Sequence, residues 1–222
     1  MLTKSEKSFS LIYVLILGSE LVSSSIASLN MLNYVAKPAI VTTLIIYFYR
    51  STQHLDPKTR QITLWALAFS VIGDVLLMFV NINPNFFIGG LISFLLGHLM
   101  YVNVFYSKRN PHIKPIGFLT ILLLYAIGLF YILKDSLGDL LVPVIIYMFV
   151  ILLMATMAYL RKNRANKTSF IFVFIGALCF IISDSLLALN KFYKPLPFAN
   201  ISIMVTYAIA QLCIVLGIKK QQ

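Results

Sequence analysis

Charge is scarce in this sequence, and acids are the scarcest charged residues. Only 11% of the 222 residues are charged, with seven Asp or Glu against 18 Lys or Arg. Soluble domains are about 25% charged and about 45–50% apolar, whereas the apolar share here is 60%. This composition excludes a soluble globular domain. It indicates a single all-α polytopic membrane domain over residues 1–222, because almost every residue lies in or beside an apolar run.

Cysteine and histidine are also rare, which excludes several kinds of site. Cys179 and Cys213 lie in apolar runs, and their spacing indicates neither a disulfide framework nor metal ligands. Of three histidines only His98 lies in such a run, whereas catalytic zinc takes three protein ligands. The G-x-S-x-G elbow of serine hydrolases and the phosphate-binding G-x-x-x-x-G-K-[ST] loop are both absent.

Long hydrophobic runs are what the sequence has in abundance. A helix needs about 20 apolar residues to cross roughly 30 Å of hydrocarbon. Eight runs fit, at about 9–27, 33–50, 61–81, 86–106, 115–133, 140–160, 168–189 and 198–218. The first has a basic start, but it is long for a signal peptide and contains Glu20, so we expect a retained helix.

Basic residues alternate between the loops that join these runs. The two termini and the loops near 50–60, 107–114 and 161–167 carry 14 Lys or Arg, and the other loops carry 3. Because basic loops resist translocation, this pattern predicts both termini in the cytoplasm, in a bacterial inner membrane. The net charge of +11 is then explained by topology, and nucleic-acid binding is not expected.

A shift of 110 residues lays one part of the chain on another. Asp74 then falls on Asp184, Gly73 on Ser183, and the following Leu-Leu pair on its counterpart. Four spans separate equivalent points, so a duplication would be a 4+4 parallel repeat. Leu-rich helices also match by chance, and the sequence leaves both readings open.

Four ionisable residues fall inside the predicted spans at a similar depth, in the outer half of the membrane. They are Glu20, Lys37, Asp74 and Asp184. A carboxylate at a helix centre costs about 2.5–3.5 kcal/mol and is by default a functional candidate. Lys37 could simply snorkel, and Glu20 could simply pair with a neighbouring helix. The two aspartates share one local context, which favours a general acid and base with one group protonated and one ionised.

A second polar layer is predicted deeper in the membrane. His98 and Tyr101 share a face of the 86–106 run at a spacing of three residues, and Tyr207 and Gln211 share a face of the 198–218 run at a spacing of four. His98 could equally be a hydrogen-bonded packing residue, and Tyr101 and Tyr207 are residues that more often pack than take part in chemistry. Glycines on the 86–106 and 168–189 runs would allow neighbouring helices to approach closely.

The ordered set of motifs resembles the YhhN-like membrane proteins, a family that includes lysoplasmalogenases. The matching segments are KP at Lys37, FSVIGDVLLM, GGLISFLLGHLMY, GALCFIISDSLLALNKF and TYAIAQLCI, with Pro143 and Tyr147 as modest additions. The resemblance implies an eight-span hydrolase with Asp74 and Asp184 as its catalytic residues. It further implies substrate-binding roles for a larger set: Lys37, His98, Tyr101, Ser183, Asn190, Lys191, Tyr207 and Gln211.

The implied reaction is hydrolysis of the vinyl ether bond of a lysoplasmalogen, a lysophospholipid. The products would be a fatty aldehyde and glycerophosphoethanolamine or glycerophosphocholine. A neutral carboxylic acid could protonate the vinyl carbon, and a carboxylate could stabilise the resulting cation and activate water. The sequence does not determine which aspartate has which role, and our working hypothesis at this point is Asp184 as the acid. Lys37 could attract the lipid phosphate. This mechanism requires no metal and no organic cofactor.

Two other functions use carboxylates within the membrane. A proton- or cation-coupled transporter would need a water path across the membrane, whereas the enzyme would need a cavity open to one leaflet. An intramembrane aspartyl protease would be expected to carry GxGD, but VIG precedes Asp74. The sequence therefore favours the hydrolase, with the transporter as its main alternative.

Overall fold

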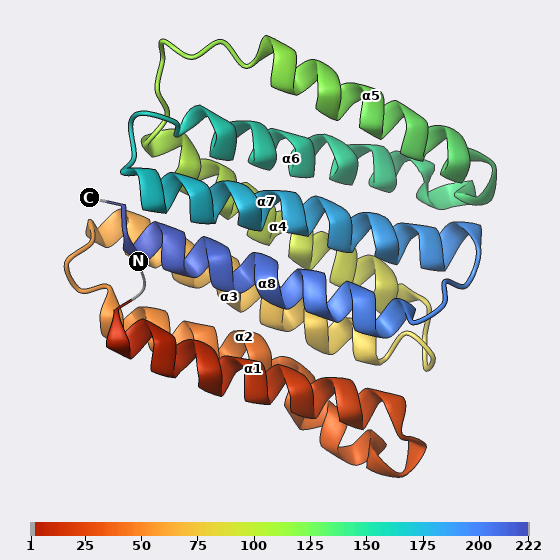
Figure 1. Ribbon diagram of the computed structural model, residues 1–222. Coiled ribbons are helices and arrows are strands. Elements are labelled where there is room, and N and C mark those ends of the chain that lie inside the picture. Colours follow the sequence, from red (N-terminus) through yellow and green to blue (C-terminus); the bar gives the residue numbers. More distant parts are fainter. Residues whose placement is uncertain (1–2, 222) are drawn as a thin grey trace. The chain divides into compact units, whose positions relative to one another are not determined.

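A computed structural model describes residues 3–221 as helices joined by short loops, without side-chain detail at Ala27 and Asn30. The long helices are α1 (Lys4–Ser25), α2 (Asn30–Ser51), α3 (Pro57–Met78), α4 (Asn85–Ser107), α5 (Ile116–Leu133), α6 (Leu141–Leu160), α7 (Lys167–Ala188) and α8 (Ala199–Lys219) (Figure 1). Within the described residues, eight helices are long and apolar enough to cross a membrane. The prediction of an all-α protein with eight spans is confirmed.

Local capping explains where several helices begin. Thr3 and Glu6 form a reciprocal capping box, so α1 begins at Lys4 and not near residue 9. Asp56 and Asn166 cap α3 and α7, each accepting a hydrogen bond from a backbone N–H three residues later. Both helices have 22 residues, and their bounds and caps differ by 110 (167 − 57, 188 − 78 and 166 − 56). The parallel repeat itself stays a prediction.

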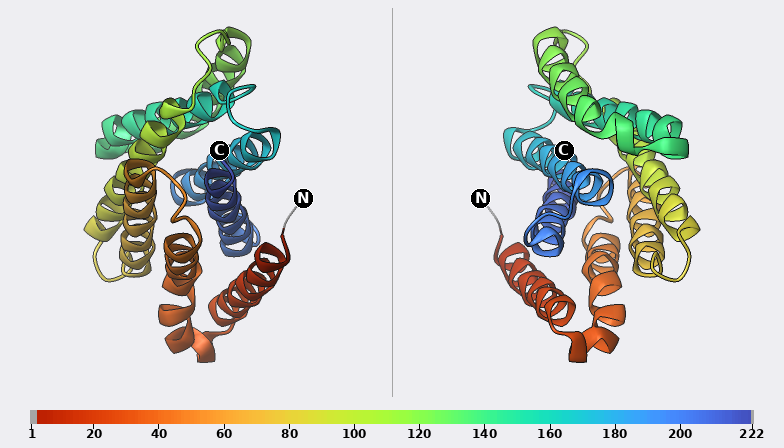
Figure 2. Two further views of the ribbon diagram at one scale, coloured as in Figure 1. Left: turned by 90° about the vertical axis from the view of Figure 1, so that its left-hand side faces the viewer. Right: turned by 90° about the vertical axis from the view of Figure 1, so that its right-hand side faces the viewer.

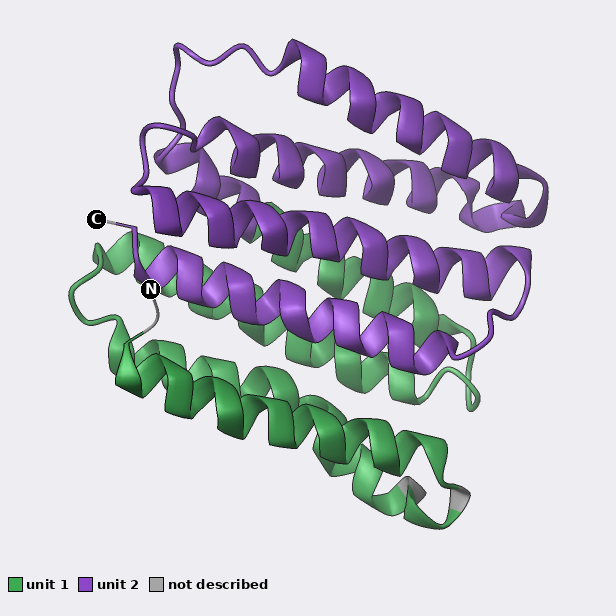
Figure 3. Ribbon diagram, viewed as in Figure 1, with its two compact units in different colours: residues 1–100 green, residues 101–222 purple. Residues whose placement is uncertain are grey.

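The chain forms two compact units, residues 1–100 and residues 101–222, so α4 contributes to both (Figure 3). In unit 1, α1 packs along α2 and α2 along α3. Close approach of α3 and α4 is possible because glycines face the partner helix. A Cβ added at Gly97 would lie 3.2 Å from the Ala66 carbonyl oxygen, and one at Gly73 would lie 2.7 Å from the Phe94 ring.

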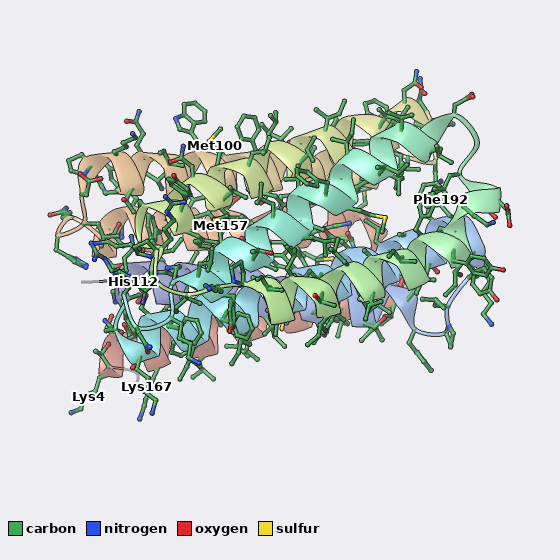
Figure 4. All side chains as sticks on the ribbon, turned by 90° about the horizontal axis from the view of Figure 1, so that it is seen from above. Lys4, Met100, His112, Met157, Lys167 and Phe192 are labelled. Atoms are coloured by element: carbon green, nitrogen blue, oxygen red, sulfur yellow. The ribbon has the colours of Figure 1, made fainter. Side chains whose placement is uncertain are left out.

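In unit 2, α5 to α8 follow one another side by side, and α7 and α8 share the most extensive contact (Figures 1 and 2). Gly176 on α7 and Gly217 on α8 permit that contact. A Cβ on Gly176 would come within 2.8 Å of the Ala210 carbonyl oxygen, and one on Gly217 within 2.8 Å of the Val173 nitrogen. Figure 4 labels Phe192 at one end of this unit and His112 and Lys167 at the other.

Arg161, a fully buried cation, binds several segments at the end of unit 2 where His112 and Lys167 lie. The Arg161 Nη2 donates to Ser169 Oγ at 3.0 Å and to Gln221 Oε1 at 2.8 Å, and its guanidinium lies over the Phe105 ring. Burial lowers the pKa of Arg161 to about 9, so the side chain remains a cation at neutral pH. Arg161 directly follows α6 and binds Gln221 just after α8, so the negative C-terminal ends of these two helix dipoles favour the buried charge, while the N-terminal turn of α7 contributes the Ser169 acceptor.

Candidate active site

Asp184 lies four residues before the end of α7 and is bound by a phenol from the neighbouring helix. The hydroxyl of Tyr147, a buried residue of α6, donates to Asp184 Oδ2 at 2.6 Å. Hydrogen bonds between a hydroxyl and an ionised carboxylate typically measure about 2.5–2.7 Å, shorter than those between neutral groups. The Tyr147–Asp184 distance falls in the range of a hydroxyl that donates to an ionised carboxylate.

The residues on either side of Asp184 bind two further helices. Ser183 Oγ donates to the Ile203 carbonyl oxygen of α8 at 3.1 Å. Ser185 Oγ accepts from the Tyr125 hydroxyl of α5 at 2.7 Å. Successive residues of a helix point about 100° apart, so three in a row can contact three neighbours. At this level α7 is therefore tied to α5, α6 and α8, which fixes the orientation of the carboxylate.

Beyond Asp184 the helix changes type. Leu189–Tyr193 forms a π-helical turn, and Asn190 Oδ1 accepts a hydrogen bond from the Leu196 N–H just after it. Such turns are rare and often occur at functional sites. The Asn190 side chain thus shapes this turn, while Lys191 is exposed.

An apolar cluster covers this end of unit 2. Its buried members are Leu133, Leu137 and Val144, and the partly buried residues packed on it include Met148, Ala188, Leu189 and Phe192. Val144 and Met148 flank Tyr147 along α6, and Ala188 is one turn from Asp184 on α7. The polar pair therefore lies next to an apolar surface, where a hydrogen bond is stronger than in water.

Three predicted residues form a buried chain of hydrogen bonds. The Tyr101 hydroxyl donates to Gln211 Oε1 at 2.9 Å, and Gln211 Nε2 donates to the Tyr207 hydroxyl oxygen at 3.3 Å. All three side chains are buried, and Phe180 contacts both tyrosine rings. The sequence placed them in one polar layer, and the structure joins them directly.

In unit 1, Asp74 lies four residues before the end of α3 and is 2% exposed. Gly73 beside it lies against the Phe94 ring of α4. His98, one turn beyond Phe94, is also 2% exposed. Ser93 Oγ binds the Phe69 carbonyl oxygen at 2.7 Å and so ties α4 to α3 near this carboxylate.

Two more of the four ionisable residues predicted within the membrane lie in unit 1, on α1 and α2. Glu20 is fully buried, and Lys37 is half-buried. Lys37 lies close enough to attract the Glu20 carboxylate, and Asn33 on α2 is a polar neighbour of that carboxylate. This is the contact with a neighbouring helix that the sequence left open for Glu20.

Comparison with known proteins identifies the family. Residues 32–218 match the profile of the YhhN family. The chain belongs to the YhhN family. Two human relatives are named lysoplasmalogenase TMEM86B and lysoplasmalogenase TMEM86A. Each is 33% identical, over 155 and 157 residues, which is 68% of this chain in both cases. The pig lysoplasmalogenase TMEM86B is likewise 33% identical, over 156 residues.

These matches span about three fifths of the relatives' own length, 61% and 62% for the two human proteins. No solved structure matches the chain. The YhhN match contains every predicted site residue from Lys37 to Gln211, but it begins after α1. Glu20 therefore lies outside the part of the chain that defines the family.

Sequence reasoning missed three residues around Asp184. Tyr147 enters the sequence prediction only as a minor part of the YhhN resemblance, and no role is predicted for Tyr125 or Ser185. A tyrosine in an apolar span usually packs, so its type alone carried little signal. Polar spacing along α6 gives no further signal, because the next polar residue after Tyr147 is Thr156, nine positions later.

Proposed function

We propose that this member of the YhhN family is a lysoplasmalogenase-type hydrolase. It cleaves the vinyl ether bond of a lysoplasmalogen and releases a fatty aldehyde and glycerophosphoethanolamine or glycerophosphocholine. The observation that carries the proposal is the 33% identity to relatives named lysoplasmalogenase. The family match that covers residues 32–218 also includes both intramembrane aspartates.

The proposed reaction uses two carboxyl groups, Asp74 and Asp184, one of them protonated at the start. The protonated group gives its proton to the vinyl carbon and leaves an oxocarbenium ion at the ether carbon. Water attacks that ion and passes a proton to the other carboxylate, which gives a hemiacetal. As the hemiacetal collapses, its hydroxyl proton returns to the first group and the second protonates the departing oxygen. Both groups are restored, and one water is consumed.

The remaining candidates are proposed to bind the substrate. Lys37 carries a positive charge in the outer part of the membrane, where a lipid phosphate would sit. His98, Tyr101, Tyr207 and Gln211 supply polar groups deeper in the protein, and the set is completed by Ser183, Asn190 and Lys191. We further propose that the protein resides in a bacterial inner membrane with both termini in the cytoplasm, which reporter fusions at each end can test.

The experiment that tests the function is aldehyde release from a lysoplasmalogen by the purified protein. We expect Asp74→Asn and Asp184→Asn each to lower kcat by about 10²–10⁴-fold, the usual contribution of a general acid or base. Asp135→Asn and Asp139→Asn are matched controls, because both acids are exposed in the loop between α5 and α6. Full activity in either membrane variant would refute the two-carboxylate mechanism. Folded wild type that releases no aldehyde would refute the function.

A further inference from the structure

The Tyr147–Asp184 contact distinguishes one aspartate of the proposed pair. The phenol oxygen lies 2.6 Å from Asp184 Oδ2, and Tyr147 is only 8% exposed. A phenol is a far weaker acid than a carboxyl group, so the proton of this bond belongs to Tyr147 whenever Asp184 is ionised. Bonds between neutral hydroxyl groups span about 2.5–3.0 Å with a mode near 2.7–2.8 Å, so the Tyr147–Asp184 distance lies at the short end, where bonds to ionised carboxylates cluster.

We infer that Tyr147 is a positioning residue that keeps Asp184 ionised, which makes Asp184 the base of the reaction and leaves the proton delivered to carbon to Asp74. The inference rests on the proposed function for its catalytic meaning. It adds a residue from α6 to the site and assigns the two aspartates different tasks.

The other groups packed around Asp184 are consistent with this assignment. On α5, the Tyr125 hydroxyl donates its hydrogen bond to Ser185. On α8, the Ile203 carbonyl oxygen accepts a hydrogen bond from Ser183. Tyr207 on α8 contacts Phe180, one turn before Asp184. Lys191, seven residues after Asp184, is the charged residue of the π-helical turn and is exposed.

In the proposed reaction the ionised Asp184 takes the proton of the attacking water and later returns it to the departing ether oxygen. Tyr147 keeps its own proton throughout, because it stabilises the carboxylate by donation and transfers nothing. The orientation of Asp184 is thus set by Tyr147 before the substrate arrives, so no reorganisation is needed as the cation forms.

The test compares Tyr147→Phe with Tyr125→Phe across pH. Each variant removes one phenol hydroxyl that binds α7, at adjacent residues of that helix. Losing a donor to a charged group should move the acid limb of the kcat/KM profile upward by about one to two pH units in Tyr147→Phe. Tyr125→Phe should leave the limb in place. The inference would be overturned if the kcat/KM profile of Tyr147→Phe coincided with that of wild type. It would also be overturned if the acid limb shifted equally in Tyr147→Phe and Tyr125→Phe.

A second variant changes the strength of the hydrogen-bond donor at position 147 without removing its hydroxyl. A fluorinated tyrosine at position 147 has the same shape and is a stronger donor, so the acid limb should move to lower pH. A purely structural role for Tyr147 would not produce shifts of opposite sign in the two variants.

Infrared spectroscopy tests the charge of Asp184 without any substrate. Protein labelled with ¹³C in the aspartate carboxyl groups should show no protonated-acid band from Asp184 at neutral pH, with Asp184→Asn used to assign the band. In Tyr147→Phe the band should appear at a higher pH than in wild type. A protonated Asp184 in wild type at neutral pH would overturn the inference. A protein that passes this test but releases no aldehyde would refute the proposed function alone.

Discussion

Replacing Gly176 by alanine tests the helix contact that holds Asp184 in place. The added Cβ would lie 2.7 Å from Ile214 Cγ1, 2.8 Å from the Ala210 carbonyl oxygen and 3.0 Å from the Ile214 nitrogen. Two of these atoms are backbone, so a rotamer change cannot relieve the clash and α8 must move away from α7. Such overpacking costs about 1–3 kcal/mol, against a gain of about 1 kcal/mol because alanine favours the helix.

Gly128→Ala is the matched control, because a Cβ on this glycine of α5 meets nothing within 4 Å. It keeps the gain in helix propensity and has no clash. We expect the free energy of unfolding to be about 1–3 kcal/mol lower for Gly176→Ala than for Gly128→Ala, measured by denaturant titration in detergent micelles. Activity should fall only in Gly176→Ala, since the same displacement stretches the Ser183–Ile203 bond. Equal stability of the two variants would show that α7 and α8 do not pack as described.

Two further predictions concern stability, measured in the same way. Ser169→Ala removes an acceptor from the buried Arg161 cation and should cost about 1.5–3 kcal/mol, whereas Ser202→Ala, whose hydroxyl binds only its own helix, should cost much less. Comparable losses would contradict the role given to Arg161. Gly90→Ala places a Cβ 2.8 Å from the flexible end of the Leu77 side chain. The loss in free energy of unfolding that Gly90→Ala causes should therefore be smaller when Leu77 is already alanine. If the losses of the two single variants simply add in the double variant, the two residues are not in contact.

The eight spans could be predicted because length and apolarity are local properties that the membrane selects directly. The bounds were less accurate where specific bonds decide them. α1 begins earlier than expected because Thr3 and Glu6 cap it. The π-helical turn at Leu189–Tyr193 was not expected, since nothing in the local residue types distinguishes it from an α-helical turn.

In the candidate site, too, the residues set by local sequence could be predicted, and those set by packing could not. Asp74 and Asp184 could be found from sequence because a carboxylate in an apolar span is costly wherever it points. Tyr147 could not, because its role depends on the rotation of α6 about its axis, which packing determines. The sequence predicts Arg161 in a basic loop, and its burial against Phe105 and Gln221 depends on where the neighbouring helices end.

In the proposed reaction, the protein protonates a vinyl carbon and adds water to the resulting cation. The most direct measurement is mass spectrometry of the aldehyde released from a lysoplasmalogen in D₂O, with the aldehyde trapped by reduction as it forms. We expect one deuterium on the carbon next to the aldehyde carbon, and we expect this labelled product not to form in Asp74→Asn or Asp184→Asn. Aldehyde that lacks this deuterium, or labelled aldehyde formed equally fast by both variants, would contradict it.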